Sequence, residues 1–85
     1  TPDGNFAYVA NRFSDNVSVI NTNTNMVMTN VPVGGGPRGV AITPNGNFAY
    51  VTNQFSGNVS VINTNTNMVM TNVPVGNRPF GIAIK

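Results

Sequence analysis

The sequence predicts an all-β protein that is made of two copies of one repeat. Residues 1–42 align with residues 43–84 without a gap, and 34 of these 42 positions are identical. Val, Ile, Thr, Phe and Tyr, which favour strands, dominate the ordered-looking stretches, whereas Leu and Glu, which are good helix formers, are absent. Asn, which favours tight turns, accounts for 16 of the 85 residues.

Each repeat contains four predicted antiparallel strands. Aromatic and small residues alternate in the first strand, which follows a Pro-Asp-Gly turn. The predicted strands are Phe6–Asn11, Asn16–Asn21, Met26–Val33 and Gly39–Ile42, followed by Phe48–Asn53, Asn58–Asn63, Met68–Val75 and Gly81–Ile84. A period of about 40 to 45 residues with four strands per repeat is typical of the blades of a β-propeller.

Two features order the strands within a blade. Pro32 and Pro74 cannot donate a backbone hydrogen bond, so the strand that contains each should lie at the outer edge of its sheet. The short run Gly39–Ile42 suits the innermost position, because blades converge on the propeller axis. Several strands carry apolar residues on both faces, which indicates that another sheet packs on each side.

The repeat resembles a known family. Residues 50–53 read Tyr-Val-Thr-Asn, the signature of YVTN-repeat β-propellers, and residues 8–11 differ from it at one position. Thr-Pro-Asp-Gly precedes the signature in the first copy, Asn-Val-Ser-Val-Ile-Asn-Thr follows it, and Pro-x-Gly-Val/Ile-Ala-Ile closes the unit. The resemblance covers the whole chain. It implies blades like those of microbial surface-layer and other extracellular proteins, although the family's propellers usually carry more blades per chain than two.

The strand order predicts one complete blade and one split blade. Residues 39–75 supply four strands in sequence, whereas residues 6–33 lack an inner strand and residues 81–84 lack a blade. We expect Gly81–Ile84 (Gly81, Ile82, Ala83 and Ile84) to be an assembly strand that completes the first blade of a neighbouring chain. The alternative is that further repeats of a longer protein complete both blades.

Strand exchange of this kind predicts a homo-oligomer. A head-to-tail contact gives a closed ring or a filament. Because propellers have about four to eight blades, a trimer or a tetramer is the ring that we favour for two blades per chain, and a closed ring of whole chains cannot have seven.

Residues that support catalysis or bind metals are scarce. The sequence has no Cys, His or Glu, and its only carboxylate side chains are Asp3 and Asp15. Asp3 lies in a turn that accounts for it, and Asp15 is replaced by Gly57 in the second copy. General acid–base catalysis and metal binding depend on these residue types. We therefore expect no enzyme activity, no metal site and no cofactor.

The charge is small as well. The bases Arg12, Arg38, Arg78 and Lys85 give a net charge of +2, which is too low to indicate a nucleic-acid partner. No apolar run approaches the roughly 20 residues of a membrane-spanning helix, and no signal peptide is visible. An extracellular or cell-surface location is implied only by the family resemblance.

Differences between the two copies gather in the loops. Five of the eight differences fall in the loop after the second strand of a blade or in the loop between blades. Both loops lie on one face of a propeller, and loops commonly carry function on a fixed scaffold. The candidate ligand-binding residues are Arg12, Asp15, Arg38, Gln54, Asn77, Arg78 and Phe80. Arginines on this face predict an anionic glycan, an anionic polymer or a protein as ligand, and drift at exposed loops is the alternative.

Asn16 and Asn58 each begin an Asn-Val-Ser triplet that matches the N-glycosylation pattern. The same triplet also belongs to the strand pattern of the repeat, so the match has a second explanation. Taken together, these observations favour a structural or scaffold module built from propeller blades, and a binding module that uses its loop face is the alternative.

Overall fold

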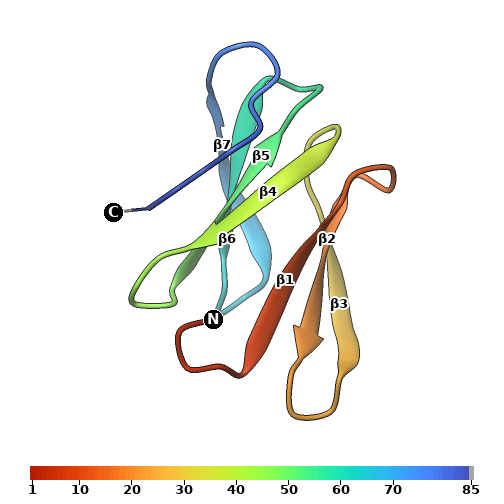
Figure 1. Cartoon of the computed structure of the whole chain (residues 1–85), viewed down its shortest axis with the longest axis vertical. Coiled ribbons are helices and arrows are strands. Elements are labelled where there is room, and N and C mark those ends of the chain that lie inside the picture. Colours follow the sequence, from red (N-terminus) through yellow and green to blue (C-terminus); the bar gives the residue numbers. More distant parts are fainter. Residues whose placement is uncertain (85) are drawn as a thin grey trace.

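The computed structural model describes residues 1–84, and Lys85 lies outside the described residues. Seven strands form two antiparallel sheets, the first with the order β1-β2-β3 and the second with the order β4-β5-β6-β7 (Figure 1). The strands are β1 (Phe6–Asn11), β2 (Asn16–Asn21), β3 (Met26–Pro32), β4 (Pro37–Ile42), β5 (Phe48–Asn53), β6 (Asn58–Asn63) and β7 (Met68–Pro74). The described part of the chain has no helix, and so none that could cross a membrane. The all-β prediction is confirmed.

Corresponding strands of the two sheets pair in the same register. Phe6 of β1 lies opposite Asn21 of β2, and the equivalent residue Phe48 lies opposite Asn63. The proline-containing strands β3 and β7 lie at the outer edge of each sheet, as their missing backbone donors predict. The second sheet differs from the first by the additional strand β4, which pairs with β5.

The predicted strand Gly81–Ile84 does not form within the single chain, in which residues 75–84 contain no strand. This segment passes over β4 and β5 and does not extend a sheet edge (Figure 1). The Thr52 hydroxyl donates a hydrogen bond to the carbonyl oxygen of Phe80 at 2.9 Å, and a Cβ built on Gly39 would lie 3.6 Å from Ile82. A segment in this position has no strand to pair with, so no ladder forms. Its pairing with another chain stays a prediction.

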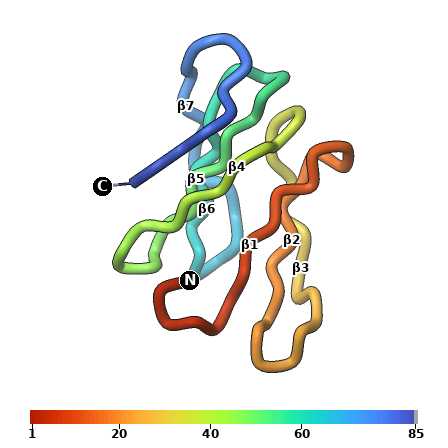
Figure 2. The backbone as a smooth tube through the Cα atoms, in the orientation of Figure 1, coloured from red at the N-terminus to blue at the C-terminus, as the bar shows by residue number. Residues whose placement is uncertain are grey.

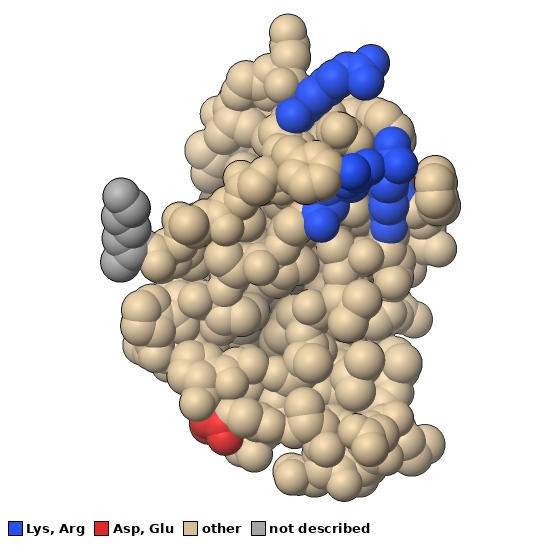
Figure 3. Space-filling model, in the orientation of Figure 1, with Lys and Arg blue, Asp and Glu red and all other residues tan. Residues whose placement is uncertain are grey.

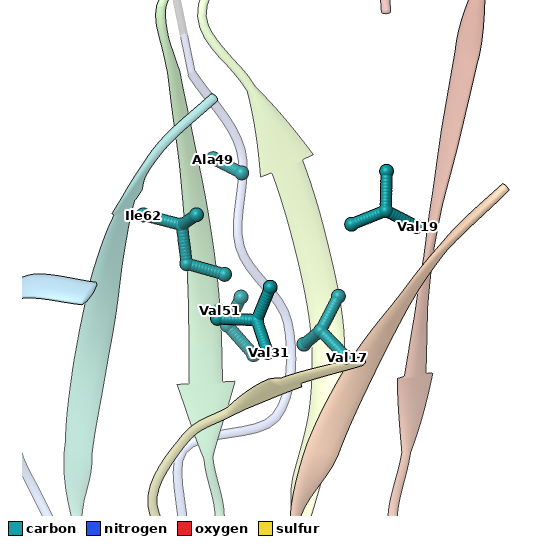
Figure 4. Close-up of a cluster of buried hydrophobic side chains, with 6 residues drawn as sticks. All are labelled: Val17, Val19, Val31, Ala49, Val51 and Ile62. Carbon is teal, nitrogen blue, oxygen red and sulfur yellow. The ribbon is translucent and has the colours of Figure 1, made fainter. Parts of the chain in front are cut away.

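The hydrophobic core lies between the two sheets. Three valines of β2 and β3 face the side chains of β5 and β6, and all of them are almost completely buried (Figure 4). These core residues are Val17, Val19, Val31, Ala49, Val51 and Ile62. β1 lies beside β4 along the same side of the molecule (Figure 2). The two sheets also share a hydrogen bond of 2.6 Å from the Tyr8 hydroxyl to the Asn67 side-chain oxygen.

Candidate functional site

All three arginines lie at one end of the molecule. Figure 3 shows the positively charged side chains gathered there, over the turns and connectors that join the strands. We call this the loop end, which comprises the turns at residues 12–15 and 54–57 and the connectors at residues 34–36 and 76–78. Every residue of the predicted ligand-binding set lies in the loop end or next to it.

Backbone hydrogen bonds join the first connector to the turn of the second sheet. The Gln54 N–H donates to the Gly36 carbonyl oxygen at 2.9 Å, and the Phe55 N–H donates to the Gly35 carbonyl oxygen at 3.0 Å. In the other direction, the Gly35 N–H donates to the Ser56 hydroxyl at 2.7 Å. We call this set of contacts the internal junction.

Glycine is required in this connector by close packing. A Cβ on Gly34 would lie 2.8 Å from the amide nitrogen of the Asn53 side chain, and a Cβ on Gly36 would lie 2.6 Å from the Phe55 ring. Gly36 also has a φ of 66°, a left-handed conformation that glycine adopts without strain. The three glycines therefore form a tightly packed connector between the sheets.

Three of the predicted ligand-binding residues take part in the same junction. The Asp15 carboxylate accepts a hydrogen bond of 3.0 Å from the Gly36 N–H. The Arg38 guanidinium donates to the side-chain oxygen of Gln54 at 3.5 Å. The Asp15 bond holds the first connector to the turn of the first sheet, and the Arg38 bond joins β4 to the turn after β5.

Aromatic rings lie beside the guanidinium groups of Arg12 and Arg38. The Arg12 guanidinium carbon lies 5.2 Å from the centre of the Phe13 ring and 5.4 Å from that of Phe55. Arg38 lies 4.2 Å from the centre of the Phe80 ring. These distances are within the range of cation–π attraction. The comparison of the two repeats missed Phe13 and Phe55 because they are identical, although an aromatic residue in a polar turn is itself a signal.

Asn77 and Arg78 border a hollow at the loop end. The hollow has a volume of about 330 Å³ and lies between the second connector and the turn after β5. Gln54, Phe55 and Ser56 contribute to its wall. Arg78 has a φ of 52°, at the position where the first repeat has Gly36.

The two candidate glycosylation residues belong to polar ladders across the sheets. The Asn58 side-chain oxygen accepts a hydrogen bond of 2.8 Å from the Asn53 amide, which also donates to the Ser60 hydroxyl at 2.8 Å. Ser60 donates onward to the side-chain oxygen of Asn72 at 2.7 Å. Asn16 accepts the equivalent bond from Asn11 in the first sheet. Ser60, the third residue of the second triplet, is completely buried.

Ionisable groups are few elsewhere in the described chain. The Thr1 hydroxyl and the Asn5 N–H both bond to the Asp3 carboxylate and lower its pKa. Burial raises the pKa of the Tyr8 hydroxyl. No three His, Cys, Asp or Glu side chains come together among residues 1–84.

Equivalent residues of the two repeats differ in exposure. Val51, on the face of the second sheet that contacts the first, is 0% exposed, whereas the equivalent Val9 is 42% exposed. On the other face of each sheet the first repeat is the buried one, since Val31 is 2% exposed and its equivalent Val73 is 43% exposed. Each sheet therefore has one covered face and one open face.

Comparisons with known proteins give the family. A family model described as lactonase, seven-bladed β-propeller, matches residues 1–74. No curated protein matches the chain.

Three solved structures share the fold of the chain. The hydrazine synthase of Kuenenia stuttgartiensis has a TM-score of 0.91 and 32% identity over 93% of this chain and 22% of that chain. Dihydro-heme d1 dehydrogenase NirN in complex with DHE has a TM-score of 0.79 and 23% identity, over 92% of this chain and 18% of that chain. Apo AztD from Citrobacter koseri has a TM-score of 0.77 and 20% identity, over 91% and 23%.

The chain thus spans less than a quarter of each of these structures. Its two sheets are part of a propeller, and the chain belongs to the lactonase family of seven-bladed β-propellers.

Proposed function

We propose that this chain is a structural module of an extracellular or cell-surface scaffold, in which further blades stack on both of its open faces. The observation that carries the proposal is the contrast between identical residues: Val51 and Val31 are buried by the neighbouring sheet, whereas Val9 and Val73 are exposed. The same sequence that forms a blade interface inside the chain is thus presented on its outer faces. A second copy of the chain offers matching surfaces in the correct order.

The open faces carry enough apolar area to favour assembly. Val9, Val27, Val73 and Val75 are 42–56% exposed. Complete burial of one such side chain contributes roughly 1.5–3 kcal/mol. Burying the remaining half of each would add several kcal/mol per junction, a large fraction of the roughly 5–15 kcal/mol that stabilises a domain.

The free edge of β1 can pair with the last segment of a second copy of the chain. On the second sheet, β4 occupies the edge of β5, with Gly39 opposite Thr52 and Ile42 opposite Ala49. Because the repeats are nearly identical, the segment Gly81–Ile84 of another copy fits the edge of β1 in the same way. The register expected from β4 and β5 is Gly81 with Ala10, Ile82 with Val9, Ala83 with Tyr8 and Ile84 with Ala7.

Copies of this chain alone would form a trimer, a tetramer or a head-to-tail filament. The family is described as seven-bladed, and seven is not a multiple of two. A ring of that size would need repeats besides whole copies of this chain. Particle mass distinguishes these forms.

Deletion of Gly81–Lys85 tests the scaffold proposal. The full chain should form a particle several times its monomer mass of 8.9 kDa, and the deletion variant should lose this particle because the edge of β1 stays open. Deletion of Lys85 alone is the matched control and should assemble normally. Light scattering coupled to size exclusion gives the mass. A full chain that stays monomeric at every concentration, or a deletion variant that assembles like the parent, would contradict the proposal.

We propose no catalytic role for this chain by itself. It contains no His, Cys or Glu, and one of its two aspartates, Asp15, is engaged by the Gly36 N–H. These features favour a structural function over the hydrolysis that the family's name suggests.

A binding function is the second candidate, and the Phe13 ring favours it. This ring is 89% exposed and lies against the Arg12 guanidinium. Exposed aromatic and guanidinium groups suit an anionic glycan or polymer, or a protein. Replacing Arg12, Arg38 and Arg78 with Ser should abolish salt-sensitive retention on a sulfated polysaccharide column, with little change in folding. Retention of the triple variant equal to that of the parent would exclude this candidate.

A further inference from the structure

We propose that side chains of the loop end fix the order in which repeats follow one another. We call residues 1–42, which contain Arg12, the first-type repeat, and residues 43–84, which contain Gln54, the second-type repeat. The connector at residues 76–78, together with Phe80, fits a following repeat of the first type and not one of the second type. This inference rests on the proposed stacking of further blades and adds to it the identity of the neighbour.

The internal junction supplies the template for the next one. Within the chain, Arg38 of the first repeat meets Gln54 of the following repeat, guanidinium to amide oxygen, at 3.5 Å. Phe80 is the equivalent of Arg38 in the second repeat. If another repeat follows the second sheet in the same way, Phe80 meets the residue of that repeat that is equivalent to Gln54. That residue is Arg12 in a first-type repeat.

The two positions change together between the repeats. Arg38 faces an amide oxygen, which accepts its hydrogen bond. The Phe80 ring already lies against the Arg38 guanidinium of its own chain, and Arg12 of the next copy would add a second cation–π contact to this ring. Each connector residue is thus matched to one loop residue.

The wrong order is penalised by charge. If two first-type repeats followed each other, Arg38 would meet Arg12, and two guanidinium groups would occupy the space that a 3.5 Å hydrogen bond now fills. If two second-type repeats followed each other, Phe80 would meet the Gln54 amide and gain no cation–π attraction. Attraction in one order and repulsion in another is how interfaces achieve specificity.

Backbone groups would keep their partners in the new junction. The Arg12 and Phe13 N–H groups would donate to the carbonyl oxygens of Arg78 and Asn77, as Gln54 and Phe55 donate to Gly36 and Gly35. The Asn77 N–H would donate to the Ser14 hydroxyl, as the Gly35 N–H donates to Ser56. The hollow beside Asn77 and Arg78 is the place that this incoming turn would occupy.

One contact has to differ from the template. Gly36 leaves no space for a Cβ, because the Phe55 ring would lie 2.6 Å away, yet the equivalent residue is Arg78. The incoming ring must therefore turn aside. Phe13, at 89% exposure, has more freedom to do so than Phe55, at 60%.

The test uses the full chain and its self-association constant, measured by analytical ultracentrifugation. In F80R the connector would present a guanidinium group to Arg12 of the next copy. Like charges at this distance should weaken association at least about tenfold. The introduced guanidinium would also repel Arg38 of its own chain, so the deciding variant is F80R/R12Q, which recreates the arginine–glutamine pair of the internal junction and should recover most of the lost affinity. T24R adds the same charge in the exposed turn between β2 and β3, at the opposite end, and should associate like the parent (Figure 1).

The outcomes separate this inference from the proposal on which it rests. A parent chain that does not associate overturns both. A parent that associates, with F80R unchanged or with F80R/R12Q no better than F80R, overturns the repeat order alone and leaves the scaffold intact.

Discussion

Truncating Val9 and Val51 to alanine measures whether the open face of the first sheet is covered in solution. The two residues occupy the same position in the two repeats, but Val51 is completely buried and Val9 is 42% exposed. Replacing a buried valine with alanine removes two methyl groups, which lowers the free energy of unfolding by about 1.6 kcal/mol through the lost transfer term. The cavity left at Val51 raises this loss to about 2 kcal/mol. In a single chain, V9A should cost only about 1 kcal/mol, because Val9 is little more than half buried.

In the assembled protein the two costs should converge. If a preceding sheet covers Val9 as the first sheet covers Val51, V9A should also cost about 2 kcal/mol. For a domain of this size, each kcal/mol shifts the melting temperature by about 4–8 °C, so the difference is measurable. Circular dichroism melts of both variants should be recorded at the concentration where the parent is assembled. If V9A remains near half the effect of V51A there, the open face is not an interface.

Three other predictions concern the junctions. The melting temperature of the parent should rise over a hundredfold increase in concentration, because association and folding are linked; a constant value with a monomeric mass would contradict assembly. G34A should destabilise the chain by about 1–3 kcal/mol, since its Cβ would lie 2.8 Å from the Asn53 side chain, whereas G76A, with open space around it, should have little effect in the monomer; equal denaturant midpoints would refute this packing argument. The raised pKa of Tyr8 favours the neutral hydroxyl in the folded state, so its contribution should be complete below pH 10.0 and lost as the pH rises through its folded pKa. Y8F should remove that pH dependence and the bond to Asn67, and an unchanged alkaline stability profile would exclude the effect.

The repeat made most of the fold predictable. Its four-strand pattern gave the all-β class and six of the strands with their bounds nearly correct, and Pro32 and Pro74 placed the outer strands at the sheet edges. The short strand β4 begins at Pro37, two residues before the predicted Gly39. Periodicity within a repeat therefore determines the local structure well.

The sequence is less informative where the structure depends on a neighbour. Gly81–Ile84 has the same pattern as Gly39–Ile42, but a strand forms only against a partner, and the single chain offers none at that place. The loop end was predicted from differences between the copies. That comparison located the arginines but not Phe13 and Phe55, which are identical and stack against Arg12.

The identity of the strands has a consequence for folding kinetics. β2 and β6 have the same sequence, so β1 would form equally good pairs with either of them. Correct pairing closes a turn of four residues between Asn11 and Asn16, whereas pairing with β6 would close a loop of 46 residues, from residue 12 to residue 57. The longer loop costs about 2 kcal/mol more in chain entropy, a preference of about thirtyfold.

With a preference of that size, β1 pairs with the wrong strand in a few molecules of every hundred during refolding. An identical strand from a second molecule also competes for β1, and raising the concentration favours it. Refolding yield should therefore fall as concentration rises, even under conditions in which the finished assembly becomes more stable.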